Sequence, residues 1–330
     1  MVDQTADQKT TVGSDGTTHA LSNSGINDLM ISPLRYWARH IDPHREIPAD
    51  TPAKAFGRAL HAAVLQPDKF KALFCEQFVP PEGTLTTVGE LRSWISDKGG
   101  KPKGSAKTGL IEQAQKIDAN VPIYDVLIEQ FKDRNIGKSV VPSDAWRRIQ
   151  GAAQALRDEP MLTEILASGE AEKRYFVHYD GINLKAYMDW VTPEWTVDLK
   201  TIATGSHGER SFDREVSTAI WYRGYYRQAY FYSLVRSIGV GNGNPQTGPR
   251  FLFAFVESEP PHEVRLREMR PKEFGEVNLL WERARIEVNR CMETYRECVL
   301  KFRIGERPWR YARQIEALQD CEIPALGYGG

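Results

Sequence analysis

The chain has 330 residues, of which 41% are hydrophobic and 26% charged, and its net charge is −1. This balance is that of a soluble globular protein with a sizeable core, and it excludes a collagen and a coiled coil. No stretch approaches the ~20 apolar residues of a membrane span, and the four cysteines are too few for a disulfide framework. We therefore expect a cytoplasmic protein with reduced thiols and no membrane contact.

The first expected elements are helices that follow a polar tail. Residues 1–24 lack aromatic and most large apolar side chains, which predicts a disordered tail. Ser32 and Pro33 predict a helix start, with serine as the cap and proline at the first helical position. A second helix is expected over residues 53–66, where apolar residues recur at helical spacing before Pro67.

The segment 92–109 differs in composition from its surroundings. It combines five basic residues with one acidic residue and several glycines, which predicts a flexible loop of local charge +4. Two interpretations remain open, a solvated surface loop and a loop that contacts phosphates. The basic residues are Arg92, Lys98, Lys101, Lys103 and Lys107. Helical patterns follow at about 109–134 and 144–167.

The period of the pattern then changes from helix to strand. Alternating residues predict consecutive antiparallel strands, with a turn at Asp180 and Gly181. The predicted strands cover 173–179, 184–191 and 195–201. A long helix (213–237), a loop (238–248), strands at 250–258 and 262–269, and a helix (271–302) should follow. This order predicts an α/β core with a helical N-terminal region.

Two carboxylates and a lysine fall together in this pattern. Asp198 and Lys200 share one face of their strand, while Leu199 points into the core. Asp189 lies on the preceding strand, across a short turn. Carboxylates bind hard divalent cations such as Mg²⁺, and an ammonium beside them can stabilise charge on a phosphate. A D-x-K triplet alone is common on surface strands, so more evidence is needed.

Three separated motifs supply that evidence. Gly57 and His61 form G-x-x-x-H, residues 198–201 read DLKT, and the run from Gly224 to Tyr232 reads G-Y-x-x-Q-x-x-x-Y. Together they resemble the PD-(D/E)XK nucleases, and more narrowly the exonuclease VIII (RecE-type) branch, related to the RecB nuclease domain. The resemblance covers about residues 24–315. Met188 stands where the proline of the family motif would be, as in many relatives.

The resemblance implies a role for each matching residue. It implies Asp189 and Asp198 as metal-binding carboxylates and Lys200 as the catalytic lysine. His61 and the Leu199 backbone carbonyl would complete the metal site, which would bind Mg²⁺ or Mn²⁺. Supporting or DNA-contacting residues would be Gln228, Tyr232, Glu172 and Thr201. Glu172 has an equally simple interpretation as a solvated acid before a strand.

The implied fold is a PD-(D/E)XK core, a central mixed sheet flanked by helices. We expect a nuclease domain over 25–315, with a helical part (25–168) and a catalytic part (169–315), and a tail over 316–330. Some relatives hold an iron–sulfur cluster, but the spacing of Cys75, Cys291, Cys298 and Cys321 favours ordinary thiols.

The implied activity is metal-dependent degradation of linear double-stranded DNA from 5′ ends. The implied setting is phage or prophage recombination, with a ring-shaped homo-oligomer acting on DNA ends beside a single-strand-annealing recombinase. Two alternatives remain open. One is a non-catalytic DNA-end-binding scaffold of the same fold, and the other is an endonuclease or helicase-associated nuclease of this class.

Overall fold

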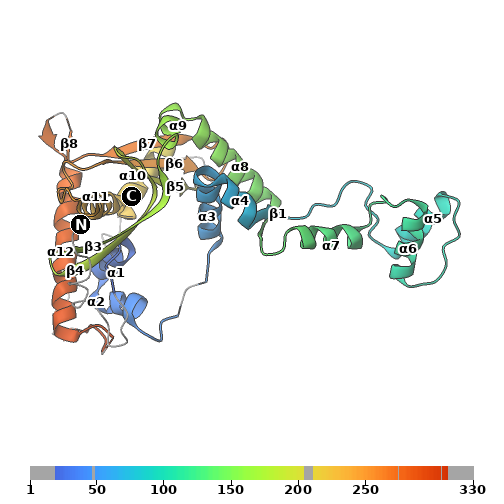
Figure 1. Cartoon of the computed structure of the whole chain (residues 1–330), viewed down its shortest axis with the longest axis horizontal. Helices are drawn as coiled ribbons and strands as arrows, with labels where there is room; N and C mark the ends of the chain where they lie inside the picture. Colours follow the sequence, from blue (N-terminus) through green and yellow to red (C-terminus); the bar gives the residue numbers. More distant parts are fainter. Residues whose placement is uncertain (1–18, 47–48, 204–210, 274, 306, 311–330) are drawn as a thin grey trace, which may run out of the picture.

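A five-stranded mixed sheet forms the centre of the molecule (Figure 1). The computed structural model describes residues 19–310, except 47–48, 204–210, 274 and 306. The strand order is β3-β4-β5-β6-β7, so β5 is the central strand. The strands are β3 (Glu170–Tyr179), β4 (Ile182–Val191), β5 (Trp195–Ile202), β6 (Arg250–Glu257) and β7 (Val264–Met269).

The pairing of the strands confirms the predicted hairpin and the mixed sheet. β3, β4 and β5 pair antiparallel in chain order, β5 and β6 pair parallel, and β6 and β7 pair antiparallel. Asp180 and Gly181 make the β3–β4 turn with φ angles of 48° and 77°, which suit a tight hairpin. The parallel β5–β6 pair needs a crossover, and two helices supply it.

Helices cover both faces of the sheet, as predicted for an α/β core. On one face pack α1 (Asn23–Ile31), α10 (Phe212–Tyr222), α11 (Tyr225–Gly239) and α12 (Leu279–Phe302). On the other face pack α3 (Pro52–Leu65), α4 (Pro67–Leu73), α8 (Ser143–Asp158) and α9 (Pro160–Leu166). β5 is therefore buried on both sides, and its side chains are held in place by packing.

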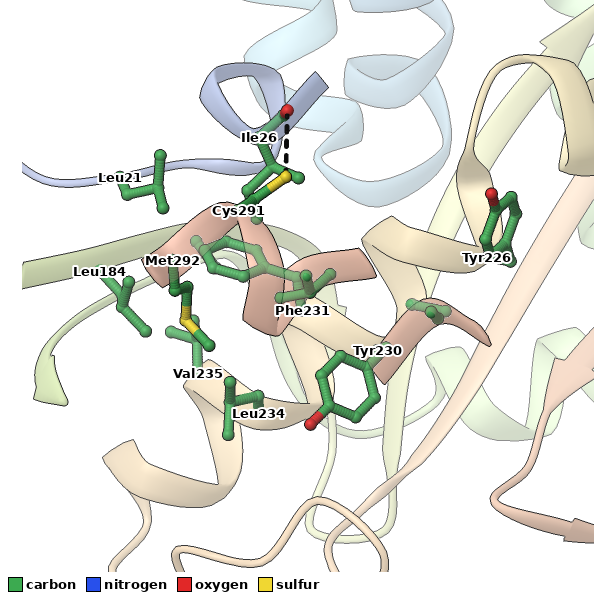
Figure 2. Packing of buried hydrophobic residues seen from close by; sticks show 14 of the residues in the cluster. Leu21, Ile26, Leu184, Tyr226, Tyr230, Phe231, Leu234, Val235, Cys291 and Met292 are labelled. Atoms are coloured by element: carbon green, nitrogen blue, oxygen red, sulfur yellow. Dashed lines mark hydrogen bonds between the residues drawn. The ribbon is translucent and has the colours of Figure 1, made fainter. Parts of the chain in front are cut away.

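The N-terminal segment belongs to the fold further upstream than predicted. Leu21 is fully buried and forms a bridge with Leu184 of β4, because its apolar side chain fills the core between α1 and the sheet. Residues 19–24 are thus ordered, and the predicted tail boundary at 24 is wrong. Figure 2 shows this junction, where Leu21, Ile26 of α1 and Met292 of α12 meet around Phe231. Residues 1–18 and 316–330 lie outside the described residues.

Short helices follow as the capping residues predict. Ser32 caps α2 (Pro33–Tyr36) by accepting a hydrogen bond from the Arg35 N–H, and a π-helical turn (Trp37–Ile41) continues it. α3 ends at Leu65, before Pro67, as expected.

Residues 77–138 form an arm that projects from the body (Figure 1). The arm carries α5 (Val88–Asp97), α6 (Lys107–Ile117) and α7 (Tyr124–Arg134), and a small core of its own around Leu91, Ile95 and Leu110. Its stem is a parallel pair, β1 (Phe74–Glu76) with β2 (Ser139–Val141).

The arm corrects two predictions. Only residues 98–106 of the predicted 92–109 loop are non-helical, because Thr87 and Glu90 form a capping box that starts α5. The Gln113 side chain bonds both the N–H and the carbonyl of Lys103, at 2.9 and 2.8 Å, so this loop is held in shape. The helical pattern predicted at about 109–134 is divided between α6 and α7.

Two further long helices are shorter than predicted. The run 213–237 is broken at Gly224, whose φ of 68° ends α10 and starts α11. The helix predicted from 271 begins at Leu279, because a small hairpin, β8 (Lys272–Glu273) with β9 (Glu276–Val277), precedes it. Within the described part of the chain, no helix combines the length and apolarity of a membrane span.

Candidate metal centre

The centre is built where β4 and β5 lie side by side. Asp189 of β4 accepts a hydrogen bond from the Leu199 N–H at 2.8 Å, which fixes its carboxylate against β5. Leu199 packs in the apolar cluster with α3 and α8, and Asp198 and Lys200 point the other way. The predicted alternation along β5 is thus present, and it brings the Lys200 ammonium against Asp198 Oδ2.

His61 reaches this site from α3, 138 residues away in sequence from Leu199. Its Nε2 lies 3.0 Å from the Leu199 carbonyl oxygen, and its Nδ1 lies 3.5 Å from Asp189 Oδ1. If Nε2 carries the proton and donates to the carbonyl, Nδ1 is the nitrogen with a free lone pair. The two distances orient His61 with Nδ1 toward Asp189 and Nε2 toward the Leu199 carbonyl, so Nδ1 of the neutral ring is the nitrogen that could bind a cation.

Glu172 completes a group of three candidate ligands. Ligand atoms of His61, Glu172 and Asp189 all lie within 4.8 Å of one another. Glu172 lies inside β3 rather than before the hairpin, and its φ is 56°, a left-handed conformation that is costly for a residue with a Cβ. This strain coincides with the carboxylate that joins the group, which favours the ligand interpretation over that of a solvated acid.

Asp198 is held by partners on both of its oxygens. Asp198 is only 2% exposed. Gln228 Nε2 donates a hydrogen bond to its Oδ1 at 2.6 Å, and its Oδ2 faces the Lys200 ammonium. Gln228 is itself buried at 6% exposure, so the structure places it as a positioning partner of Asp198 rather than as a surface DNA contact. Tyr232 follows one turn later on α11, where burial raises its pKa above the usual range.

The charges of the centre are strongly coupled. Burial, together with the nearby Asp189 charge, raises the pKa of Asp198 to about 6 against the opposing effect of Lys200. Burial alone would lower the pKa of His61, but the Asp189 carboxylate outweighs it and the pKa rises to about 9. Burial would likewise lower the pKa of Lys200, yet Asp198 and Asp189 raise it, so Lys200 is a cation at neutral pH.

Lys200 is less exposed than the sequence suggested. A D-x-K triplet is common on surface strands, but β5 is the central strand and the Lys200 side chain is 17% exposed. Its Nζ lies 5.0 Å from the Tyr225 ring centroid, a cation–π contact from the start of α11. Thr201, paired with Val256 of β6, lies on the strand face of Leu199.

The donor set fits a divalent cation. Two carboxylates and an imidazole nitrogen are ligands of Mg²⁺, Mn²⁺ and Zn²⁺, and the carboxylates suit the harder ions. The Leu199 carbonyl, which the resemblance implies as a further ligand, lies against His61 Nε2, the ring nitrogen that faces away from Asp189. Asp198, the second carboxylate that the resemblance implies as a ligand, borders this group with its buried Oδ2 against the Lys200 ammonium. The three cysteines in the described residues, Cys75, Cys291 and Cys298, are buried thiols, and Cys321 lies outside those residues.

Cation binding at this centre should release protons. Because His61 has a pKa of about 9, it is protonated at pH 7, and only the neutral ring can bind a cation. We expect Mn²⁺ affinity to rise with pH between about 6 and 9, with about one proton released per ion at pH 7.5. Titration calorimetry in buffers of different ionisation enthalpy measures this release. In His61→Gln the release should disappear, and equal release in both proteins would contradict the ligand role of His61.

Comparison with known proteins identifies the family of the chain. Residues 22–301 match the model of a family described as a PDDEXK-like domain of unknown function (DUF3799). No curated protein has detectable sequence similarity to the chain.

Two solved structures show a more distant likeness. A protein from Eubacterium rectale described as a "putative exonuclease" is 16% identical, with 73% of this chain and 93% of that one covered and a TM-score of 0.35. The protein SSO0001 is 10% identical, with 72% and 86% covered and a TM-score of 0.25. Both TM-scores are too low to support an inference of function, whereas the family match covers most of the chain.

Proposed function

The chain belongs to the family of PDDEXK-like domains of unknown function, and from that membership we propose that it is a metal-dependent exodeoxyribonuclease. The observation that carries the proposal is the group of His61, Glu172 and Asp189 beside the Asp198–Lys200 pair. Ligands for a divalent cation next to a fixed ammonium can supply the charge stabilisation that metal-dependent hydrolysis of a phosphodiester needs.

Each residue has a defined task in this proposal. A divalent cation, held by His61, Glu172 and Asp189, would polarise the scissile phosphate and make a bound water more acidic. Lys200 remains protonated, so it donates hydrogen bonds to a phosphate oxygen and stabilises negative charge there, rather than accepting a proton. Asp198 keeps the ammonium charged and in place, and Gln228 holds Asp198 in turn.

The finer properties rest on the resemblance to RecE-type exonucleases. It supports linear double-stranded DNA as substrate, degradation from 5′ ends, and Mg²⁺ as the natural ion. It also supports a ring-shaped homo-oligomer and a single-strand-annealing recombinase as partner. Lys98, Lys101 and Lys103 have no ion-pair partner among the described residues, and they remain candidates for phosphate contacts on the arm. Lys107 is instead paired with Asp125.

Linear and circular DNA separate the proposed function from its alternatives. With Mg²⁺, we expect a linear duplex to be degraded to nucleotides, while a covalently closed circle of the same sequence stays intact. Gel analysis of both substrates with one enzyme sample provides the measurement. Nicking of the circle would identify an endonuclease, and binding of linear ends without product in Mg²⁺ or Mn²⁺ would identify a scaffold.

A further inference from the structure

One face of the β3–β4 hairpin continues away from Glu172 and Asp189. Its paired residues are Arg174 with Tyr187, Phe176 with Lys185, and His178 with Asn183. The residues that alternate with them, such as Tyr175 and Val177, pack in the core with α11 and α12. The hairpin side chains therefore lie on the opposite side of the sheet, the side from which α3 brings His61. The residues between them on β4 (Leu184, Ala186 and Met188) point the other way, into the core with α11 and α12. We call Arg174, Phe176, Lys185 and Tyr187 the hairpin face.

The hairpin face exposes an aromatic pair. Phe176 is 64% exposed and Tyr187 is 47% exposed, and their rings meet edge to face with centroids 6.0 Å apart. The Arg174 guanidinium lies 5.4 Å from the Tyr187 ring centroid. Neighbouring large apolar side chains left in water next to a candidate active site are a sign of a binding surface.

The same face carries cations that are not neutralised. Neither Arg174 nor Lys185 has an ion-pair partner among the residues that the structure describes, whereas Lys173, next to Arg174 but on the other side of the strand, pairs with Glu170 at 2.6 Å. Two cations without an anionic partner in the described part of the chain, together with two accessible rings, match the chemistry of a nucleic-acid strand, with its phosphates and unpaired bases.

We propose that a single-stranded stretch of the DNA substrate lies along the hairpin face. Bases stack on Phe176 and Tyr187, and phosphates lie at Arg174 and Lys185. The proposal rests on the proposed nuclease function and adds the path of the strand next to the scissile phosphate. From Glu172 to His178 the strand spans about 20 Å, at ~3.3 Å per residue, which is room for a few nucleotides.

The exposed rings and the charges favour single-stranded DNA over duplex DNA or a second copy of the chain as the molecule bound at the hairpin face. In a duplex the faces of the bases are covered by their neighbours, so exposed rings find stacking partners on unpaired bases. A second copy of the chain, docked by a two-fold axis on this face, would bring Arg174 and Lys185 close to the same cations of its partner. A single DNA strand has exposed base faces and negative charge, so it can stack on the rings and is attracted by the cations.

Binding of a short oligonucleotide tests the path without requiring catalysis. The probe is a fluorescein-labelled single-stranded 12-mer in Ca²⁺ buffer, followed by anisotropy. The double variant F176A/Y187A should bind at least about tenfold more weakly, because it loses stacking on two rings. Arg174→Ala should lower the slope of log affinity against log salt by about 0.7, the loss of one phosphate contact.

Matched variants control for charge and exposed area. Lys173→Ala removes the same charge from the opposite side of β3 and should leave the salt slope unchanged. Leu300→Ala removes a side chain that is 78% exposed on α12 and should leave affinity unchanged. Hydrolysis of the small diester bis(p-nitrophenyl) phosphate should also be equal in F176A/Y187A and the wild type, because that substrate needs only the metal centre.

Each contrary outcome has a distinct meaning. Wild-type affinity in F176A/Y187A together with an unchanged salt slope in Arg174→Ala would overturn the proposal. A change in oligomeric state on size-exclusion chromatography with light scattering, at unchanged affinity, would assign the face to contact between copies instead. If F176A/Y187A fails to fold, Arg174→Ala and Lys185→Ala decide through the salt slope. If the wild type hydrolyses neither DNA nor the diester, the nuclease function fails, while the binding data still decide the path.

Discussion

Replacing Lys200 with methionine should lower the rate of DNA cleavage by a factor on the order of 10² or more. Methionine keeps most of the apolar stem in its nearly buried position but removes the charge that would stabilise negative charge on the phosphate. The loss should persist at any concentration of Mg²⁺ or Mn²⁺, since the variant lacks a charge and not a ligand. Single-turnover cleavage of a labelled duplex across a metal titration measures this.

The folding of the variant needs its own control. Lys200→Met leaves Asp198 buried without its cationic partner, which raises the Asp198 pKa further and costs stability. Thermal unfolding should therefore be recorded at the assay pH, and the rate compared only where the variant is folded. Lys173→Met, a lysine of the same sheet paired with Glu170, should cleave at the wild-type rate. Near-normal cleavage by folded Lys200→Met would remove this lysine from the catalytic centre.

Replacing Asp189 with asparagine should abolish cation binding at ordinary concentrations. Asp189 contacts His61 and lies in the group of three candidate ligands, so its loss removes a negative charge and a strong oxygen ligand together. Binding of Mn²⁺, followed by electron paramagnetic resonance, should weaken by about 100-fold. Cleavage should fall with it and recover partly at high Mn²⁺, in contrast to Lys200→Met.

The same substitution of an aspartate outside the metal centre provides the control for Asp189→Asn. Asp125→Asn makes the same chemical change in the arm, where the carboxylate pairs with Lys107, and should leave Mn²⁺ affinity unchanged. Wild-type Mn²⁺ affinity in Asp189→Asn would show that the cation binds elsewhere.

The strands and the triplet on β5 could be predicted from sequence, because side-chain alternation is a local property. The pattern DLK requires Asp198 and Lys200 on one face whatever surrounds them. Their depth could not be predicted. β5 is central only because β6 pairs with it across the crossover helices, and one strand's sequence does not reveal its neighbours.

The remaining candidate ligands come together through contacts that local patterns do not encode. His61 could be proposed only through a family resemblance, since no periodicity connects α3 with β5 across 138 residues. The position of Glu172 next to His61 and Asp189 could not be predicted, because propensities give no signal for a left-handed acidic residue within a strand. Helical spacing places Gln228 and Tyr232 on one face of α11, but it does not tell that this face turns inward to Asp198.

Release of nucleotides from an end-labelled linear duplex tests the central claim most directly. The claim is that the group around Asp189, with Lys200, hydrolyses phosphodiester bonds with the help of a divalent cation. We predict that the wild type releases labelled nucleotides in Mg²⁺, that EDTA stops the release, and that Asp189→Asn and Lys200→Met release little under the same conditions. Equal release by the folded variants, or release by the wild type that continues in EDTA, would contradict the claim.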